Sequence, residues 1–332
     1  MPRVTVNLGE TGPAFLELGT EPRRGSGRRD HLSLAQVGLI ARTVHRAPEV
    51  MVKVLTRGGT DMAAVGRHFE YLSRKGKLEI ETDDGRHLSG RGAEKALLED
   101  WDLDLDELRP TADLRSSRHR APKLAHKLVF SMPPGTPPQK VLEAVRSLTR
   151  EEFALKHRYA MVLHTDEPHP HVHVVVKALG EDGKRLNIRK ETLRTWRREF
   201  ARHLRDLGVE ANATNRVSRG VTRPQKINGI YWADQGGRST HMHERISEVA
   251  RELARGDLKV EPAREQILAT RRAVVRGWLA VAETLEKQEE KDLAVAVRRF
   301  VQEMPAPLTE KQWIAAQLAD DRPARSPPAR TR

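Results

Sequence analysis

The residues best suited to chemistry are concentrated in one short segment of the chain, His164-Thr-Asp-Glu-Pro-His-Pro-His-Val-His173. His171 and His173 begin an apolar run that predicts a β-strand, and residues two apart on a strand point to the same side. A four-residue hairpin loop, 167–170, would place Asp166 opposite His171. The same loop would place His164 opposite His173, and opposed residues of antiparallel strands share a face. The segment therefore predicts three imidazoles and one carboxylate on a single patch.

Such a patch has the chemistry of a divalent-metal site. Imidazole nitrogens suit transition metals, and three protein ligands leave coordination positions open for a substrate. We therefore predict that His164, His171 and His173 are the ligands. Asp166 is either a further ligand or a partner that orients one of the histidines, and His169, in the turn, is a candidate for such an outer partner. The alternative is a set of ordinary hydrogen-bonded histidines, against which the convergence of three of them argues.

A tyrosine on the polar side of a predicted helix is a candidate nucleophile. Residues 61–75 predict a helix with one apolar stripe, and Tyr71 lies roughly 140° from the centre of that stripe at 100° per residue. Arg67, Arg74 and Lys75 share the face of Tyr71. These cations would attract a phosphate to the phenol. The alternative is an ordinary surface tyrosine.

A second basic surface is predicted on the helix over 190–207, where Lys and Arg greatly outnumber Asp and Glu. The side chains that we expect to contact nucleic-acid phosphates are Arg67, Arg74, Lys75, Arg189, Lys190, Arg194, Arg197 and Arg198. Phosphate contacts of this kind make the binding affinity fall steeply with salt concentration. A solvated basic face without a ligand is the alternative interpretation.

The order of the predicted elements indicates an α+β fold with a mainly antiparallel central sheet flanked by helices, because strands and helices are mixed without regular alternation. The strands are predicted at about 49–55, 77–82, 123–132, 158–166 and 171–179. The helices are predicted at about 61–75, 92–108, 138–154, 190–207, 241–256, 261–290, 291–303 and 309–319. Only helices are predicted beyond about residue 222, so we expect a helical C-terminal extension.

Four regions are therefore expected along the chain. They are a basic, partly flexible N-terminal arm (1–48), a catalytic domain (49–222), a helical accessory region (223–320) and a disordered basic tail (321–332). The arm contains a basic, glycine-containing stretch, and the tail is rich in proline and arginine. Neither composition favours a packed core.

The composition narrows the class of protein. The 332 residues include 59 Lys+Arg against 46 Asp+Glu, a formal net charge of +13, which favours an anionic partner such as nucleic acid. The chain has no cysteine, which excludes disulfides, thiolate nucleophiles and cysteine-type zinc sites. We recognise neither a signal peptide nor an apolar run of the roughly 20 residues that span a bilayer, and we expect a cytoplasmic protein without membrane insertion.

Two segments in this order resemble the VirD2-type relaxases of conjugative plasmids and integrative elements, which belong to the HUH endonuclease superfamily. They are Tyr71-Leu-Ser-Arg-Lys-Gly-Lys-Leu-Glu79 and His164-x-Asp-x-x-His-Pro-His-x-His-Val-Val-Val176. Leu128-Val-Phe-Ser-Met-Pro-Pro-Gly-Thr136 resembles the strand and turn between them, and the resemblance covers roughly residues 50–220. In this group the tyrosine precedes the histidines, whereas it follows them in rolling-circle initiators. One departure is that the family's tyrosine commonly lies close to the N-terminus.

The resemblance implies a site- and strand-specific DNA nickase with an HUH-type fold. Tyr71 would be the nucleophile that forms a 5′-phosphotyrosyl adduct, Asp166 its assistant, and the three histidines the ligands of a divalent metal, Mg²⁺ or Mn²⁺. The implied partners are single-stranded DNA at an origin of transfer, accessory DNA-binding proteins and a type IV secretion coupling protein, with which the chain would pilot the strand into a recipient cell. The rivals are a rolling-circle initiator or transposase with the same chemistry, and a non-catalytic DNA-binding protein with a structural metal.

Overall fold

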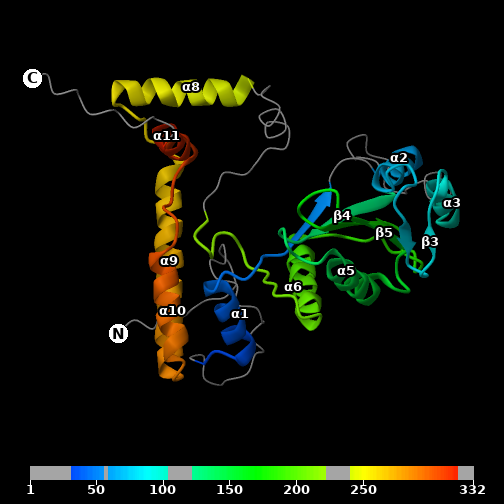
Figure 1. Ribbon diagram of the computed structural model, residues 1–332, viewed down its shortest axis with the longest axis horizontal. Helices are drawn as coiled ribbons and strands as arrows, with labels where there is room; N and C mark the ends of the chain where they lie inside the picture. The colour runs from blue at the N-terminus through cyan, green and yellow to red at the C-terminus, as the bar shows by residue number, and fades with distance from the viewer. Residues whose placement is uncertain (1–30, 56–58, 104–121, 222–239, 321–332) are drawn as a thin grey trace, which may run out of the picture. The chain divides into compact units, whose positions relative to one another are not determined.

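The computed structural model describes residues 31–55, 59–103, 122–221 and 240–320. The chain divides into two compact units (Figure 1), one of residues 46–213 and one that joins the residues before 46 to those after 213. The basic stretch of the predicted N-terminal arm and the predicted C-terminal tail lie outside the described residues. Each unit is described below by itself.

The first unit is built on a six-stranded antiparallel sheet, which confirms the predicted α+β class. Its strands are β1 (Met51–Leu55), β2 (Ile80–Thr82), β3 (His87–Leu88), β4 (Ala125–Ser131), β5 (Tyr159–His164) and β6 (His171–Lys177). They lie in the order β1-β4-β6-β5-β2-β3, so the histidine strands β5 and β6 are neighbours at the centre of the sheet. A central position buries both faces of these strands and fixes their side chains firmly.

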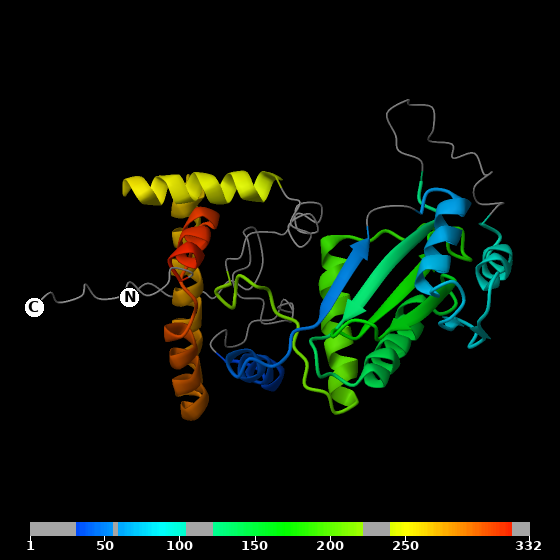
Figure 2. The ribbon, with the colours of Figure 1, turned by 45° about the horizontal axis from the view of Figure 1, so that its top comes forward.

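Helices cover both faces of this sheet (Figure 2). They are α2 (Met62–Leu72), α3 (Ala93–Asp100), α5 (Pro138–Phe153) and α6 (Lys190–Asp206). Val172, Val174 and Val176 of β6 pack in the core that includes α5 and α6, whereas Val175 packs in the core of α2 and α3. Because side chains alternate along a strand, His171 and His173 must lie on the α2 face with Val175.

Helix α2 is shorter than the predicted helix over 61–75. It begins after Asp61, whose carboxylate accepts a hydrogen bond from the Ala64 amide at 2.7 Å, and it ends at Leu72. Arg74, Lys75 and Gly76 then adopt left-handed backbone angles, with φ of 52°, 60° and 82°. Three such residues in succession cannot continue a right-handed helix.

The second unit is helical. Its helices are α1 (Leu34–Val44), α8 (Thr240–Arg255), α9 (Ala263–Lys287), α10 (Lys291–Gln302) and α11 (Glu310–Asp320). Helix α1 lies within the predicted N-terminal arm, where Ser33 and Gln36 form a capping box, and its Ile40 packs with Trp278 and Phe300 in one apolar core. In the part of the chain that the structure describes, no helix combines the length and the apolarity needed to span a bilayer.

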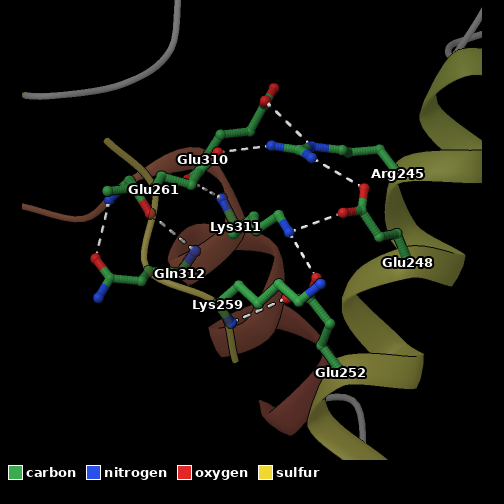
Figure 3. Close-up of polar contacts among 9 residues, drawn as sticks. Arg245, Glu248, Glu252, Lys259, Glu261, Glu310, Lys311 and Gln312 are labelled. Atoms are coloured by element: carbon green, nitrogen blue, oxygen red, sulfur yellow. Dashed lines mark hydrogen bonds and ion pairs between the residues drawn. The ribbon is translucent and has the colours of Figure 1, made fainter. Parts of the chain in front are cut away.

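A polar network joins α8 to α11 (Figure 3). Lys311, which is 6% exposed, donates hydrogen bonds to Glu248 at 2.8 Å and to Glu252 at 2.7 Å. Arg245 pairs with Glu248 at 3.0 Å and with Glu261 at 2.6 Å. The hydrogen bonds from Lys311 and Arg245 lower the pKa of Glu248 to about 2. The network therefore anchors α11 on α8 through ionised groups across the neutral pH range.

Candidate active site

The β5–β6 hairpin corrects the predicted pairing of the histidines. His164 lies opposite His171, and Val162, not His164, lies opposite His173. The residues between the two strands are 165–170, a loop of six residues instead of four, so Asp166 belongs to the loop and does not face His171. Pro168 and Pro170 explain the longer loop, because proline offers no amide hydrogen to the ladder and restricts the residue before it.

The three predicted ligands nevertheless converge. Each offers one ligand nitrogen, and these nitrogens all lie within 4.8 Å of one another. The ring centroids are 4.7 Å apart for His164 and His173, 5.1 Å for His164 and His171, and 5.2 Å for His171 and His173. Imidazoles that share one ion at metal–nitrogen distances of about 2.1 Å have centroids about 5 Å apart. The cluster therefore has the dimensions of a metal site.

Hydrogen bonds to backbone carbonyls set the tautomer of two of the rings. His164, which is 1% exposed, donates from Nε2 to the carbonyl oxygen of Leu72 at 2.8 Å. His171 donates from Nδ1 to the carbonyl oxygen of His169 at 2.9 Å. A carbonyl can only accept, so the other nitrogen of each ring keeps its lone pair for a ligand bond. His169, predicted as an outer partner, thus contacts a predicted ligand through its backbone.

His173 has no such partner. Its Nδ1 is buried and makes no hydrogen bond within the described residues. Burial, followed by the neighbouring His164 and His171, lowers the pKa of His173 to about 3, and burial also lowers the pKa of His164. Both rings are therefore neutral near pH 7, the state that binds a metal.

Arg74 connects the histidines to the predicted catalytic residues. Its Nη2 contacts His164 Nδ1 at 3.3 Å and Asp166 Oδ2 at 2.5 Å. The carbon of the same guanidinium lies 4.9 Å from the centre of the Tyr71 ring. The hydrogen bond from Arg74 holds the pKa of Asp166 below its usual value. Asp166 is therefore connected to the cluster through Arg74 and lies 3.9 Å from His164 Nδ1.

Tyr71 lies in the last turn of α2, beside the cluster and open to solvent. It is 61% exposed, as predicted from its distance from the apolar stripe. Its ring stacks on His68 with centroids 6.4 Å apart, and His68 meets His173 edge-on at 6.2 Å. The carbonyl that accepts the hydrogen bond from His164 belongs to Leu72, the residue after Tyr71 in the helix. The carboxyl end of α2 therefore contacts two of the three histidines, His164 and His173.

Two residues of this region were not predicted from the sequence. His68 lies one helical turn before Tyr71, and burial, followed by the Lys127 charge, lowers its pKa to about 4. Lys127, 5% exposed on β4, points under α2 and donates to the Ala64 carbonyl at 3.4 Å; burial lowers its pKa. The available signals were a histidine three residues before the candidate nucleophile and a lysine within an apolar strand.

The predicted DNA-contact residues fall into two groups. Arg67 and Lys75 are exposed on and after α2, on the side of the sheet that carries the histidines, whereas α6 packs on the opposite face. Three of the eight are engaged within the chain: Arg74 with Asp166, Arg194 with Glu191 at 3.0 Å, and Arg197 with Glu49 at 3.9 Å. The other five of the eight are exposed and show no ion pair to a carboxylate of the described residues: Arg67, Lys75, Arg189, Lys190 and Arg198.

Solved structures with similar folds include two relaxases. One is the MobM relaxase domain bound to oriT DNA of plasmid pMV158, a Mn-bound structure, with 14% identity and a TM-score of 0.36 over 57% of this chain and 98% of that one. The other is the conjugative relaxase TrwC in complex with oriT DNA, with 15% identity and a TM-score of 0.32 over 81% of this chain and 98% of that one.

Comparisons of sequence find VirD2 endonucleases and one family model. The T-DNA border endonuclease VirD2 of Rhizobium radiobacter is 29% identical over 187 residues, 52% of this chain and 43% of the relative. VirD2 of Agrobacterium fabrum is 28% identical over 52% of this chain and 41% of the relative, so the chain spans less than half the length of these proteins. The family model of the MobA/VirD2-like relaxase nuclease domain matches residues 71–209, from the candidate tyrosine through the histidine segment. Residues 71–209 are therefore similar to the relaxase nuclease domain of the MobA/VirD2-like family.

Proposed function

We propose that this chain is a relaxase that nicks one DNA strand at an origin of transfer and remains attached to its 5′ end through Tyr71. The observation that supports this most directly is the docking of the carboxyl end of α2 on the histidine cluster. Leu72 binds His164 through its carbonyl, and Tyr71 presents an exposed phenol beside it. The carboxyl end of α2, where the matched residues 71–209 begin, thus holds the proposed nucleophile next to the cluster.

The residues present fit a divalent metal. His164, His171 and His173 would hold it, because one ligand nitrogen from each ring lies within 4.8 Å of the other two. Carbonyls also fix the second nitrogen of His164 and of His171. A bound Mg²⁺ or Mn²⁺ would polarise the scissile phosphate as a Lewis acid. The lone pair of His164 Nδ1 accepts from Arg74 in this structure, so His164 can serve as a ligand only when Arg74 releases that contact.

The proposed reaction is a transesterification: one phosphoester bond replaces another, and no bond is hydrolysed. The phenolic oxygen of Tyr71 attacks the phosphorus in line, and its proton passes to solvent. An oxygen–phosphorus bond to Tyr71 forms while the bond to the 3′ oxygen breaks, and that oxygen takes a proton from solvent and leaves as a hydroxyl. Arg74, freed from His164, would donate hydrogen bonds to the non-bridging oxygens, and Asp166 would limit how far the guanidinium moves.

The partners follow from the same proposal. Residues 49–222 would be the nickase domain, and the exposed cations without carboxylate partners would hold single-stranded DNA by its phosphates. Residues 223–320 would be an accessory region for contacts with accessory DNA-binding proteins or a type IV secretion coupling protein. The chain would then travel to the recipient cell with the strand that it carries.

The test is a covalent-adduct assay on single-stranded oligonucleotides with Mn²⁺. Tyr71→Phe removes only the nucleophilic oxygen, so we expect no SDS-stable adduct and nearly unchanged DNA affinity. Tyr159→Phe is the matched control, because it removes a phenolic oxygen from a side chain that is 4% exposed and packs in the core of the opposite face. An adduct of wild-type yield with Tyr71→Phe would refute the proposal.

A further inference from the structure

The three predicted ligands differ in how their second ring nitrogen is satisfied. His164 and His171 each donate to a backbone carbonyl. His173 has a buried Nδ1 with no hydrogen bond in the described part of the chain. A histidine that binds a metal almost always donates its remaining N–H to an acceptor, which fixes the ring and raises its basicity. The site therefore lacks a hydrogen-bond acceptor for Nδ1 of His173.

His68 is the side chain best placed to supply that acceptor. Its ring lies edge-on to His173 with centroids 6.2 Å apart. Its Nε2 is also buried and also without a hydrogen bond among the described residues. Two buried nitrogens without partners on neighbouring rings are each costly, and a hydrogen bond between them would remove both costs. A neutral imidazole has one nitrogen that can accept a hydrogen bond.

His68 does not belong among the ligands themselves. The centroids of the three predicted ligands are separated by 4.7 to 5.2 Å, whereas His68 lies 6.2 Å from His173. The ring of His68 is also nearly parallel to that of Tyr71, at an interplanar angle of 16°. His68 is therefore a ring neighbour of both a predicted ligand and the candidate nucleophile.

We propose that His68 is a positioning residue of the metal centre, whose Nε2 accepts a hydrogen bond from His173 Nδ1, directly or through one water, while its ring supports Tyr71. The inference rests on the proposed metal-dependent function. It assigns His173 Nε2 as the ligand nitrogen, because Nδ1 then carries the proton. One side chain would thus hold a ligand and the nucleophile in a fixed relation.

The experiment measures Mn²⁺ binding to the full chain by calorimetry, without DNA. His68→Phe keeps a ring to stack on Tyr71 but cannot accept, and we expect its Mn²⁺ affinity to fall about 10- to 100-fold. His68→Gln restores an acceptor and should recover the affinity to within about threefold. His87→Phe, at an exposed histidine on β3, is the control and should bind Mn²⁺ like the wild type.

An unchanged Mn²⁺ affinity of folded His68→Phe would overturn the inference. If that variant does not fold, the tautomer of His173 in the wild-type chain decides, as read from its ¹⁵N shifts: a proton on Nδ1 supports the inference and a proton on Nε2 overturns it. The proposed function fails separately. A wild type that binds Mn²⁺ but forms no adduct refutes the nickase, whereas adduct formation with unaltered metal binding by His68→Phe refutes only the role of His68.

Discussion

Arg74 links the side chains on which the proposed chemistry depends. It contacts His164 and Asp166 through one nitrogen and lies over the ring of Tyr71. Its backbone has a φ of 52°, an angle that non-glycine residues adopt rarely and that aims the side chain back over α2. A guanidinium in this position can exchange a carboxylate for a phosphate without moving far.

The candidate residues themselves could be predicted because their types and spacing are informative within short segments. The face of Tyr71 follows from helical periodicity, and the convergence of the three histidines follows from the period of a strand. His68 and Lys127 could not be assigned in this way. Their proximity to the cluster depends on α2 lying across β4 and β6, a tertiary contact that no local pattern specifies.

A buried histidine outside the site makes stability depend on pH. Burial, followed by the charge of Lys123, lowers the pKa of His126 from 6.5 to about 4; His157 and Arg185 also face it, and the Leu186 carbonyl opposes the shift. Between pH 6.5 and about 4, His126 therefore binds a proton in the unfolded chain but not in the folded chain. The free energy of unfolding should fall as the pH drops from about 6.5 to about 4.

His126→Gln should reduce this slope by no more than about 1.4 kcal/mol per pH unit, because only one titrating group is removed. Urea unfolding at several pH values measures it. The pKa values of His68 and His173 are also lowered, so part of the pH dependence of the unfolding free energy remains in the variant. An identical slope in His126→Gln and the wild type would contradict the assignment of a neutral buried His126.

At the scale of elements, the β5–β6 hairpin has the predicted faces but not the predicted register. The predicted loop of four residues was wrong, and the true pairing differs by two positions. A shift of two residues keeps every side chain on its face, whereas a shift of one would have reversed them. The cluster was therefore predicted correctly although the partner of each histidine was not, and only Asp166 lost its predicted place.

The turn after α2 fixes the end of the helix that carries the candidate nucleophile. Gly76 has a φ of 82°, and a Cβ there would lie 2.2 Å from the backbone of Gly90. Gly76→Ala should destabilise the unit by more than about 1–2 kcal/mol in urea unfolding and should lower the adduct yield, because the end of α2 must shift.

Gly85→Ala is the matched control for that turn. Its φ is 81°, but no atom lies within 4 Å of the added Cβ, so only the backbone strain is introduced. We expect a loss of about 1 kcal/mol and an unaltered adduct yield. Equal losses for the two variants would show that the close approach of Gly76 to Gly90 is unimportant.

At the scale of the whole molecule, the net charge of +13 predicts DNA binding that weakens steeply with salt. Arg198 is exposed and has no ion pair to a carboxylate among the described residues, whereas Arg194 on the same helix pairs with Glu191. Arg198→Gln should reduce the slope of log affinity against log salt by about 0.7, the value for one phosphate contact on a single strand. Arg194→Gln should change it less, and equal slopes for all three proteins would exclude α6 from the DNA contacts.

Most elements of both units were predicted, but helix α1 and strand β3 were not, and neither was the grouping of α1 with the C-terminal helices. Apolar periodicity located α9 and α10, and it located β1, β2, β4, β5 and β6. The assignment of α1 to the helical unit has no local signal, because Ile40 meets Trp278 across more than two hundred residues of sequence. Composition led to the expectation of an arm, and the contacts of α1 depend on partners that composition does not reveal.

The most direct measurement is the identity of the residue that becomes attached to DNA. The full chain is incubated with Mn²⁺ and a single-stranded oligonucleotide containing its cleavage site, and the adduct is digested and sequenced by mass spectrometry. We predict a 5′-phosphodeoxynucleotide on Tyr71 and a free 3′-hydroxyl on the released fragment. Attachment to any other side chain, or cleavage without attachment, would contradict the account.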